Sequence, residues 1–269
     1  MPVDIYGFPG LRIETWGTRH AGCEGNSNMD GGYLDMQIRQ WIIRPVIAFR
    51  EYIFRDVLPA FSNLNERANQ IGDEYYEQVG SQPASEDFDG DMSTFAEEAQ
   101  DRALSWYLMM RSLRQTMLNL LAAGLFHLTE QQLAALCRDG GFIAGPPRDT
   151  KLEEVANWYR INLRLDLSSL SSWPMIDELR FVANAVKHAE GTATRRLKSL
   201  RPELLTDPAS AEIEDFNGGS LFETKKVKAP LAGEDLFVSE GLLKSYSEAV
   251  ESFFREIAAH FDAHADECY

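Results

Sequence analysis

The chain has 269 residues, and its content of 44% hydrophobic and 25% charged residues is ordinary for a soluble globular protein. Lys and Arg number 26 against 42 Asp and Glu, which gives a formal net charge of −16. A surface this acidic repels polyanions, so the composition excludes a protein that binds nucleic acid or an anionic membrane over its whole surface. Any contact with nucleic acid must therefore be local.

The cysteines and the hydropathy profile indicate the compartment. Cys23, Cys137 and Cys268 are an odd number without paired spacing, which favours a reducing cytoplasm over a disulfide framework. The N-terminus lacks the cationic segment and the apolar core of a signal peptide. No segment reaches the roughly 18 uninterrupted apolar residues that a spanning helix needs. We therefore expect a cytoplasmic protein with no membrane contact.

The first third of the chain divides into an arm, a helical segment and a linker. Residues 1–32 are rich in Gly and Asn and show no hydrophobic period, which predicts an irregular arm or a lid. Apolar residues recur every three or four positions over 33–79, which predicts helix, and Pro45 and Pro59 should kink or divide it. Residues 81–93 are acidic and rich in helix breakers. We predict a boundary there between an N-terminal unit, 1–80, and a helical bundle, 94–269; one continuous domain that includes 33–80 is the alternative.

Two capping boxes mark the next helices. Thr94 followed by Glu97 predicts a helix that runs to about residue 138, with a break near Gly124 or Thr129 as an option. Thr150 with residue 153 predicts a second helix, through about residue 167. The sequence SSLSSWP then supplies a serine cap and an early proline for a third helix ending at Gly191, and a short helix over 192–200 follows.

The pattern changes over residues 207–238. We predict a small β-hairpin here. Its first strand is the weakly alternating run from Ser220 to Val227, which contains Phe222, and its second strand contains Leu236 and Phe237. The turn-like sequence APLAGED joins them. After residue 239 a wide apolar face indicates a final long helix. The predicted fold is mainly α: a bundle of long amphipathic helices with a small β-hairpin insertion before the last helix.

The stretch DELRFVANAVKHAEG, residues 177–191, is the main functional candidate. At about 100° per residue, its apolar residues form one stripe and its polar residues share the opposite side. The residues of interest on the polar side are Arg180, Asn184, Lys187 and His188. Arg180, Asn184 and His188 are four residues apart, so each lies about 6 Å further along the helix axis than the last. A phosphodiester could lie along such a face.

A basic patch surrounds this helix. Residues 180–201 contain six Lys or Arg and one acid, a local charge of +5 in a chain of −16. Its cations beyond the helix are candidates for phosphate binding: Arg195, Arg196, Lys198 and Arg201. Cleaving RNA without a metal needs a base for the 2′-hydroxyl proton and an acid for the leaving 5′-oxygen. It also needs cations that stabilise the charge developing on the phosphoryl oxygens. His188 suits proton transfer by its intrinsic pKa range. The alternative is that these residues form the solvated face of an amphipathic helix.

The order of long helices and the sequence LRFVANAVKH resemble HEPN-type proteins, a helical family with many RNases of toxin–antitoxin, abortive-infection and phage-defence systems. In catalytic members an Arg is followed by four to six residues and a His, and dimerisation brings two copies of this motif into one cleft. His188 matches that histidine. Arg180 is separated from it by seven residues and is followed by Phe181, so the local form is NxxKH. The resemblance spans about residues 94–264.

This resemblance implies a HEPN-like effector, a metal-independent endoribonuclease or toxin of a bacterial defence or toxin–antitoxin system. It implies catalysis by His188, with Arg180, Asn184 and Lys187 at the phosphate, and a homodimer that acts on RNA and meets an antitoxin or a defence-complex partner. The non-standard spacing leaves a second hypothesis: a non-catalytic HEPN-like module that binds RNA or a partner protein. A structural subunit whose basic patch docks an acidic partner is a third.

Other candidate sites are weaker. His260 and His264 are four residues apart among acids, but a zincin motif needs Glu where Phe261 stands, so a helix end near the terminus is the better interpretation. His127 lies in an apolar run, which indicates a core or interface residue or one that lines the same cleft as His188. No GxGxxG, P-loop, GxSxG or CxxC pattern occurs. We expect no cofactor and no metal.

Overall fold

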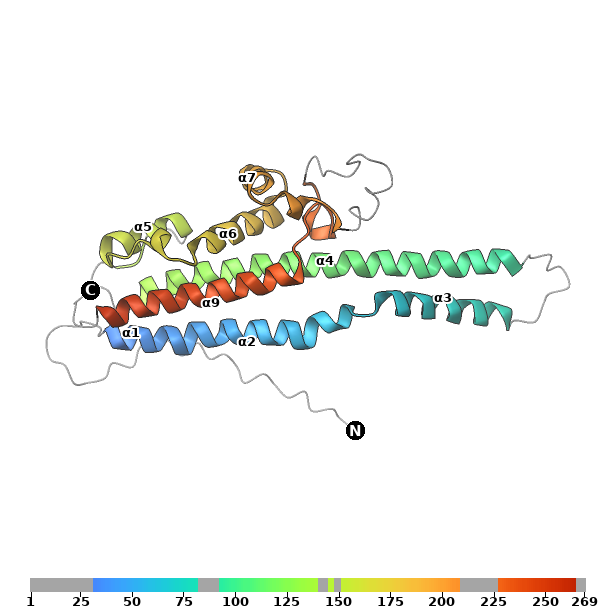
Figure 1. The fold of residues 1–269 in the computed structure, drawn as a ribbon, viewed down its shortest axis with the longest axis horizontal. Coiled ribbons are helices and arrows are strands. Elements are labelled where there is room, and N and C mark those ends of the chain that lie inside the picture. Colours follow the sequence, from blue (N-terminus) through green and yellow to red (C-terminus); the bar gives the residue numbers. More distant parts are fainter. Residues whose placement is uncertain (1–30, 82–91, 140–144, 148–150, 209–226, 265–269) are drawn as a thin grey trace, which may run out of the picture.

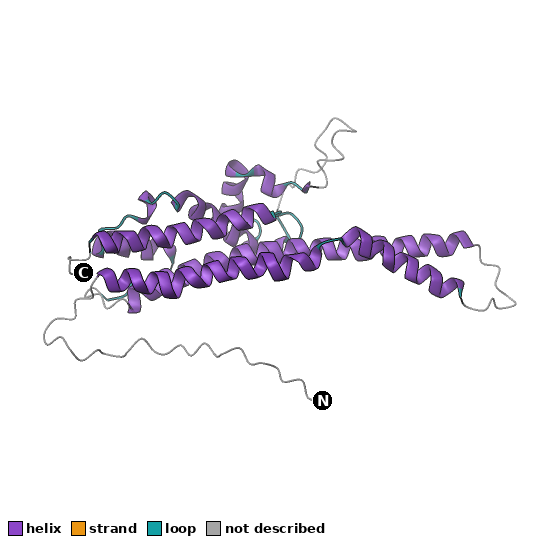
Figure 2. Ribbon diagram, turned by 60° about the horizontal axis from the view of Figure 1, so that its bottom comes forward, coloured by secondary structure: helices purple, strands orange, loops and turns teal. Residues whose placement is uncertain are grey.

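The computed structural model describes residues 31–81, 92–139, 145–147, 151–208 and 227–264. Within these ranges the chain folds into helices joined by short connections and turns, and no strand is present (Figure 2). The mainly α prediction is confirmed. None of the described helices is both long and apolar enough to cross a bilayer.

The N-terminal helical segment departs from regular α-helix beside its prolines. Helices α1 (Gly31–Ile38) and α2 (Arg44–Tyr52) are joined by a π-helical turn, and Pro45 lies at the start of α2. A second π-helical turn and a 3-10 turn that contains Pro59 follow. Asn63 then adopts a left-handed conformation, with φ of 58°, before α3 (Leu64–Gly80) begins. At Pro45, which lacks a backbone donor, the right-handed helical backbone continues through a π-helical turn, whereas the helix ends after Pro59, where Ser62 is extended and Asn63 is left-handed.

Helix α4 (Met92–Asp139) is one uninterrupted helix of 48 residues, about 72 Å long by its rise per residue. The optional break at Gly124 or Thr129 is absent. A side chain at Gly124 would meet nothing within 4 Å, and the Thr129 hydroxyl donates to the Leu125 carbonyl at 2.9 Å inside the helix. Neither residue therefore interrupts the backbone hydrogen bonds.

Helix α3 and the first half of α4 form an antiparallel pair that projects from the rest of the molecule (Figure 1). Gly72 allows close approach: a Cβ there would lie 3.1 Å from the Ala99 carbonyl oxygen. The Tyr75 hydroxyl donates to Glu98 at 2.5 Å, and the Arg102 guanidinium lies 3.9 Å from the centre of the Tyr75 ring. These contacts join the two helices of the projection.

Helix α9 (Glu240–Ala263) is the centre of the body. It lies between α4 and the α1–α2 segment, and α6 packs on both α4 and α9 (Figure 1). Its apolar face is fully buried, including Tyr246, Phe253, Phe254 and Phe261. The Ser239 hydroxyl caps the helix by accepting from the Leu242 N–H at 3.1 Å. The prediction of a final helix after residue 239 with a wide apolar face is confirmed.

Three shorter helices complete the body: α5 (Leu152–Asn162), α6 (Trp173–His188) and α7 (Thr192–Leu200). Helix α5 ends about five residues earlier than predicted, and Thr150 of the predicted capping box lies outside the described residues. Helix α6 has the predicted early proline, but its cap comes from another helix. The Glu256 carboxylate of α9 accepts from the backbone N–H groups of Ser171 at 2.7 Å and Ser172 at 3.2 Å.

The predicted β-hairpin is not present in the described residues. Its first strand, over 220–226, lies outside them, and residues 227–239 form a loop with one 3-10 turn. The buried side chain of Asn119 on α4 holds this loop, donating to the carbonyls of Pro230 at 2.8 Å and Leu236 at 2.9 Å. Its oxygen accepts from the Val238 N–H at 3.4 Å. The loop's polar backbone groups are thus satisfied by an amide side chain instead of by a second strand.

The predicted boundary at 81–93 lies largely outside the described residues. Helices from its two sides are packed together, since α3 lies on α4 and α1 lies on α9. The division into an N-terminal unit and a bundle stays a prediction.

Candidate functional site

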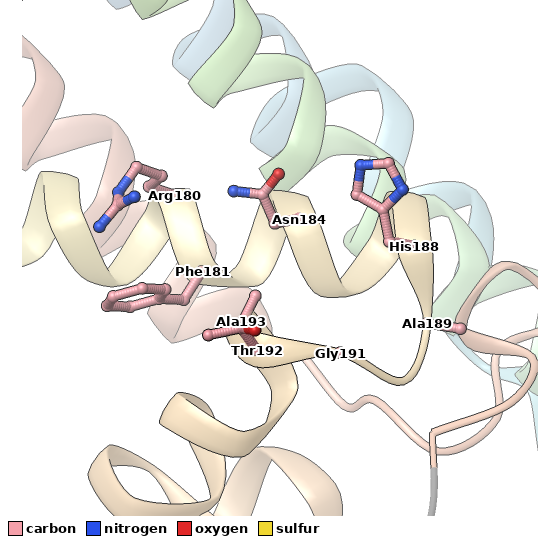
Figure 3. A pocket seen from close by; sticks show the side chains of 8 residues that line it. All are labelled: Arg180, Phe181, Asn184, His188, Ala189, Gly191, Thr192 and Ala193. Carbon is pink, nitrogen blue, oxygen red and sulfur yellow. The ribbon is translucent and has the colours of Figure 1, made fainter. Parts of the chain in front are cut away.

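The polar face of α6 opens onto a pocket shared with the start of α7. We call this the α6–α7 pocket; its volume is about 340 Å³. Figure 3 shows Arg180, Asn184 and His188 rising in a row from the same side of α6. The remaining lining comes from the second face of α6 and from the turn into α7: Phe181, Ala189, Gly191, Thr192 and Ala193. The predicted alignment of three polar residues along the helix is thus present.

A sharp turn after His188 brings α7 back against α6. Ala189 ends α6 with a left-handed φ of 57°, two residues before Gly191. The Thr194 hydroxyl donates to the Ala189 carbonyl at 2.5 Å, and both Thr194 and Leu197 are buried. The turn therefore fixes the N-terminal end of α7, Thr192 and Ala193, as one wall of the pocket.

Asn184 and His188 carry unused hydrogen-bonding capacity. Asn184 is half-buried and His188 is exposed, and neither forms a hydrogen bond or ion pair with any residue in the described ranges. An asparagine amide offers both donors and acceptors, and a histidine ring offers a donor and an acceptor or two donors. Both side chains line the same pocket four residues apart, so one ligand can contact both.

Arg180 lies at the other end of the row but is already paired. Its Nη2 donates to Asp177 Oδ1 at 2.6 Å and its Nη1 lies 3.4 Å from Glu153 Oε1. The guanidinium also lies 4.6 Å from the centre of the Phe181 ring, and 25% of the side chain is exposed. Two carboxylates therefore offset much of the positive charge that the sequence pattern places in this pocket.

Lys187 is separated from the other three candidates. It lines a groove on α4 and is absent from the lining of the α6–α7 pocket. The reason is helix geometry: consecutive residues differ by about 100° around the axis, so Lys187 and His188 point in different directions. The structure brings Arg180, Asn184 and His188 together and places Lys187 elsewhere.

The cations of α7 and its end fall into two groups. Arg195 and Arg196 are exposed, and Arg195 donates to the hydroxyl of Thr192 at 3.2 Å. Lys198 is half-buried. Arg201 instead pairs with Glu178 at 3.0 Å and Glu203 at 2.5 Å. Two arginines of the predicted patch thus face solvent near the pocket, and a third is bound by acids.

Arg201 belongs to a network that joins α6 to α9. The hydroxyl of Tyr246, a fully buried residue, donates to Glu178 Oε1 at 2.7 Å, and Arg201 Nη1 donates to the same oxygen. Burial raises the pKa of Tyr246 well above its ordinary value, and the neighbouring Glu178 carboxylate adds to the effect. The phenol therefore keeps its proton and remains a donor.

The other histidines are placed away from this pocket. His127 Nδ1 lies 3.2 Å from Glu130 Oε2 and lines the α4 groove with Lys187, so it does not share the cleft of His188. His260 Nε2 lies 3.1 Å from the Leu163 carbonyl, and His264 Nδ1 lies 2.7 Å from the carbonyl of His260. The part of the chain that the structure describes contains no group of three or more His, Cys, Asp or Glu placed to hold a metal.

Two features of the site were missed by sequence reasoning. One is the wall formed by Thr192 and Ala193, which depends on the turn at Ala189. The other is the pairing of His127 with Glu130 beside Lys187. The spacing of three residues between His127 and Glu130 was a usable signal, because such residues are neighbours on a helix surface.

No family model, curated protein or solved structure matches this chain. The mostly helical architecture is compatible with an all-helical HEPN-like fold. The likeness to that family therefore rests on the order of the helices and on residues of α6.

Proposed function

We propose that the chain is a HEPN-like effector that cleaves RNA without a metal, in a bacterial defence or toxin–antitoxin setting. One observation carries the proposal: Asn184 and His188 lie in line in an accessible pocket with no partner among the described residues. Polar groups that serve the fold are paired, as Glu178 and Asn119 are. Groups left unpaired in a pocket are available to a ligand.

The proposed chemistry is transesterification at a phosphodiester. A base takes the proton of the 2′-hydroxyl, the hydroxyl oxygen attacks phosphorus, and an acid protonates the leaving 5′-oxygen. His188 serves as one of these two groups. The Asn184 amide donates to a phosphoryl oxygen, and the exposed Arg195 and Arg196 add positive charge at the rim. The products are a 2′,3′-cyclic phosphate and a free 5′-hydroxyl.

A second copy of the chain supplies the other proton-transfer group in this proposal. Among the described residues His188 is the one histidine that lines the α6–α7 pocket, and acid and base roles require two groups at the reacting bond. Two α6 helices that face each other would place two copies of His188 at one phosphate, as in the HEPN resemblance. A homodimer is therefore part of the proposal, and an antitoxin or defence-complex partner would restrain it.

A second candidate function is a non-catalytic HEPN-like module that binds RNA or a partner protein. The pairing of Arg180 with Asp177 and Glu153 favours it. An arginine neutralised by two carboxylates contributes less to the charge of a phosphoryl transition state than a free one. Under this hypothesis the pocket and the rim arginines hold a strand that is not cut.

The test is cleavage of a mixed RNA pool by the purified chain in EDTA, followed by analysis of the new ends. We expect cleavage that leaves 2′,3′-cyclic phosphates. His188→Ala should lower the rate by about 100-fold or more, the usual contribution of a general acid or base. Binding without cleavage would support the module instead.

His264→Ala is the matched control. His264 is near the end of α9, outside the α6–α7 pocket, and its side chain contacts the His260 carbonyl. We expect this variant to cleave at the normal rate. Full activity in His188→Ala, with both variants showing the same helical circular dichroism, would contradict the catalytic proposal.

A further inference from the structure

The groove on α4 is a second candidate site. We define the α4 groove by His127, Glu130, Gln131, Ala134 and Arg138 of α4 together with Lys187 of α6; its volume is about 320 Å³. The α4 residues are three, four, seven and eleven positions after His127, so they form one stripe along the helix. All but Ala134 carry a polar side chain.

A carboxylate orients the histidine of this groove. His127 Nδ1 lies 3.2 Å from Glu130 Oε2. An ionised carboxylate only accepts hydrogen bonds, so Nδ1 donates to Glu130, and the imidazolium form of the ring has its Nε2–H left to donate to an anionic ligand. The ring is also 5.8 Å from that of Phe126, centre to centre. The imidazole is thus held by Glu130 on one side, and 45% of the His127 side chain is exposed and open to a ligand.

Two cations accompany this pair. Arg138 and Lys187 are exposed, and within the described ranges neither forms a hydrogen bond or ion pair. Each stands in the last turn of its helix, where a cation also stabilises the helix dipole. That role does not require cations from two helices to line one groove. Among the described lining residues Glu130 is the single acid, so this described lining is cationic in a chain of −16.

The cations are spread along the groove. His127 and Arg138 are eleven residues apart on one helix, about 16 Å along its axis. A single small anion cannot contact both, whereas a longer ligand with several negative groups can. Phosphate groups match this lining, because arginine binds them through two parallel N–H groups and lysine through a point charge.

We propose that the α4 groove is an oxyanion site, distinct from the α6–α7 pocket, for a ligand with two or more phosphate groups. One phosphate group is bound at the His127–Glu130 pair and another at Arg138, with Lys187 contributing from the α6 side. Glu130 acts as a positioning residue for the imidazole. The site does not depend on cleavage at His188.

The first test is calorimetric titration of the full chain with inorganic tripolyphosphate at low salt. We expect binding that weakens roughly tenfold in Arg138→Ala and in Lys187→Ala, since each removes a charged hydrogen bond. Lys244→Ala is the matched control: it removes an exposed lysine of α9 that lines neither site, and it should bind like the unaltered chain. No binding, or equal affinity in all three variants, overturns the proposal.

The second test locates the ligand. Imidazole nitrogen NMR of the full chain should show the His127 signals moving as tripolyphosphate is added, while the His188 signals stay in place. Movement of His188 alone would put the anion in the α6–α7 pocket and overturn the proposal. His127→Ala removes a half-exposed ring together with its contact to Glu130, and the signals that disappear in this variant are those of His127.

A competition experiment between tripolyphosphate and DNA identifies the source of the phosphate groups. A short single-stranded DNA lacks the 2′-hydroxyl, so it reports binding without cleavage. Displacement of tripolyphosphate by this DNA assigns the groove to a nucleic-acid strand. Failure to displace it assigns the groove to small phosphorylated molecules. Both results retain the oxyanion site.

Discussion

The two halves of α6 use their polar residues differently. In the N-terminal half, Asp177, Glu178 and Arg180 are all paired, with each other or with residues of α5, α9 and the end of α7. In the C-terminal half, Asn184, Lys187 and His188 have no hydrogen bond or ion pair within the described residues. The polar residues of this helix are thus structural at one end and available to ligands at the other.

This difference changes how the basic region should be interpreted. A local charge of +5 over residues 180–201 overstates the charge offered to a ligand, because Arg180 and Arg201 are each bound to two acids. The available groups are fewer and are divided between two sites. His188 faces the α6–α7 pocket and Lys187 faces the α4 groove.

The largest effect on stability should come from Glu178→Ala. It would leave Arg201 and the buried Tyr246 hydroxyl without their shared acceptor, and we expect a loss of about 3 kcal/mol in the free energy of unfolding. Asn184→Ala is the comparison from the other half of α6 and should change it by less than about 0.5 kcal/mol. Urea unfolding measures both. Equal effects would remove the distinction between the halves.

Arg201→Ala and Arg195→Ala should separate structure from binding. Removing Arg201 leaves Glu178 and Glu203 without their cation and should cost about 2 kcal/mol in stability, with RNA affinity nearly unchanged. Removing the exposed Arg195 should weaken RNA binding by about fivefold at nearly unchanged stability, because the proposal assigns it to phosphate and its contact with the Thr192 hydroxyl is exposed. Fluorescence anisotropy and urea unfolding are the measurements. The reverse pattern would show that the two arginines had been assigned to the wrong roles.

Tyr246→Phe should lower the free energy of unfolding by a smaller amount, about 1.5 kcal/mol, because the hydroxyl that donates to the charged Glu178 carboxylate is lost. It should also change the pH dependence of stability. The fold raises the Tyr246 pKa, so above about pH 10 the unfolded chain releases a phenol proton that the folded chain retains. Stability should therefore fall as pH rises from 9 to 11, and less steeply in the variant. Parallel curves would contradict the buried hydrogen bond.

The smallest effect is expected from Asp177→Asn, which keeps the shape of the side chain and removes its charge. It should free the Arg180 guanidinium for phosphate and raise RNA affinity by about threefold. The slope of log affinity against log salt should become steeper by up to about 0.7. Glu240→Gln is a control with the same change of charge on α9, outside both sites. An equal gain there would mean that overall charge is responsible.

Local pattern sufficed for most of the fold. Periodic apolar residues predicted the helices over 33–79 and after 239, because amphipathicity is recorded in neighbouring residues. The second half of the predicted hairpin, residues 227–239, is a loop in the described structure because it is held by Asn119, more than a hundred positions earlier in the chain. Nothing local to that loop shows this.

In the candidate site, too, the local features could be predicted from the sequence and the long-range contacts could not. The row of Arg180, Asn184 and His188 follows from helix geometry and was predictable. The pairing of Arg201 through Glu178 with Tyr246 depends on contacts up to 68 positions apart and was not. Helix geometry alone predicts that Lys187 and His188 point in different directions. The groove that Lys187 lines could not be predicted, because it depends on where α4 packs against α6.

The most direct test of the difference between the halves of α6 compares His188→Ala with Arg180→Ala. Initial rates of RNA cleavage in EDTA should fall by about 100-fold or more for His188→Ala, which loses a proton-transfer group. Arg180→Ala should lower the rate by less than about tenfold, because its charge is already offset by Asp177 and Glu153. A greater loss in Arg180→Ala than in His188→Ala would contradict the account and place the chemistry at the N-terminal half of the helix.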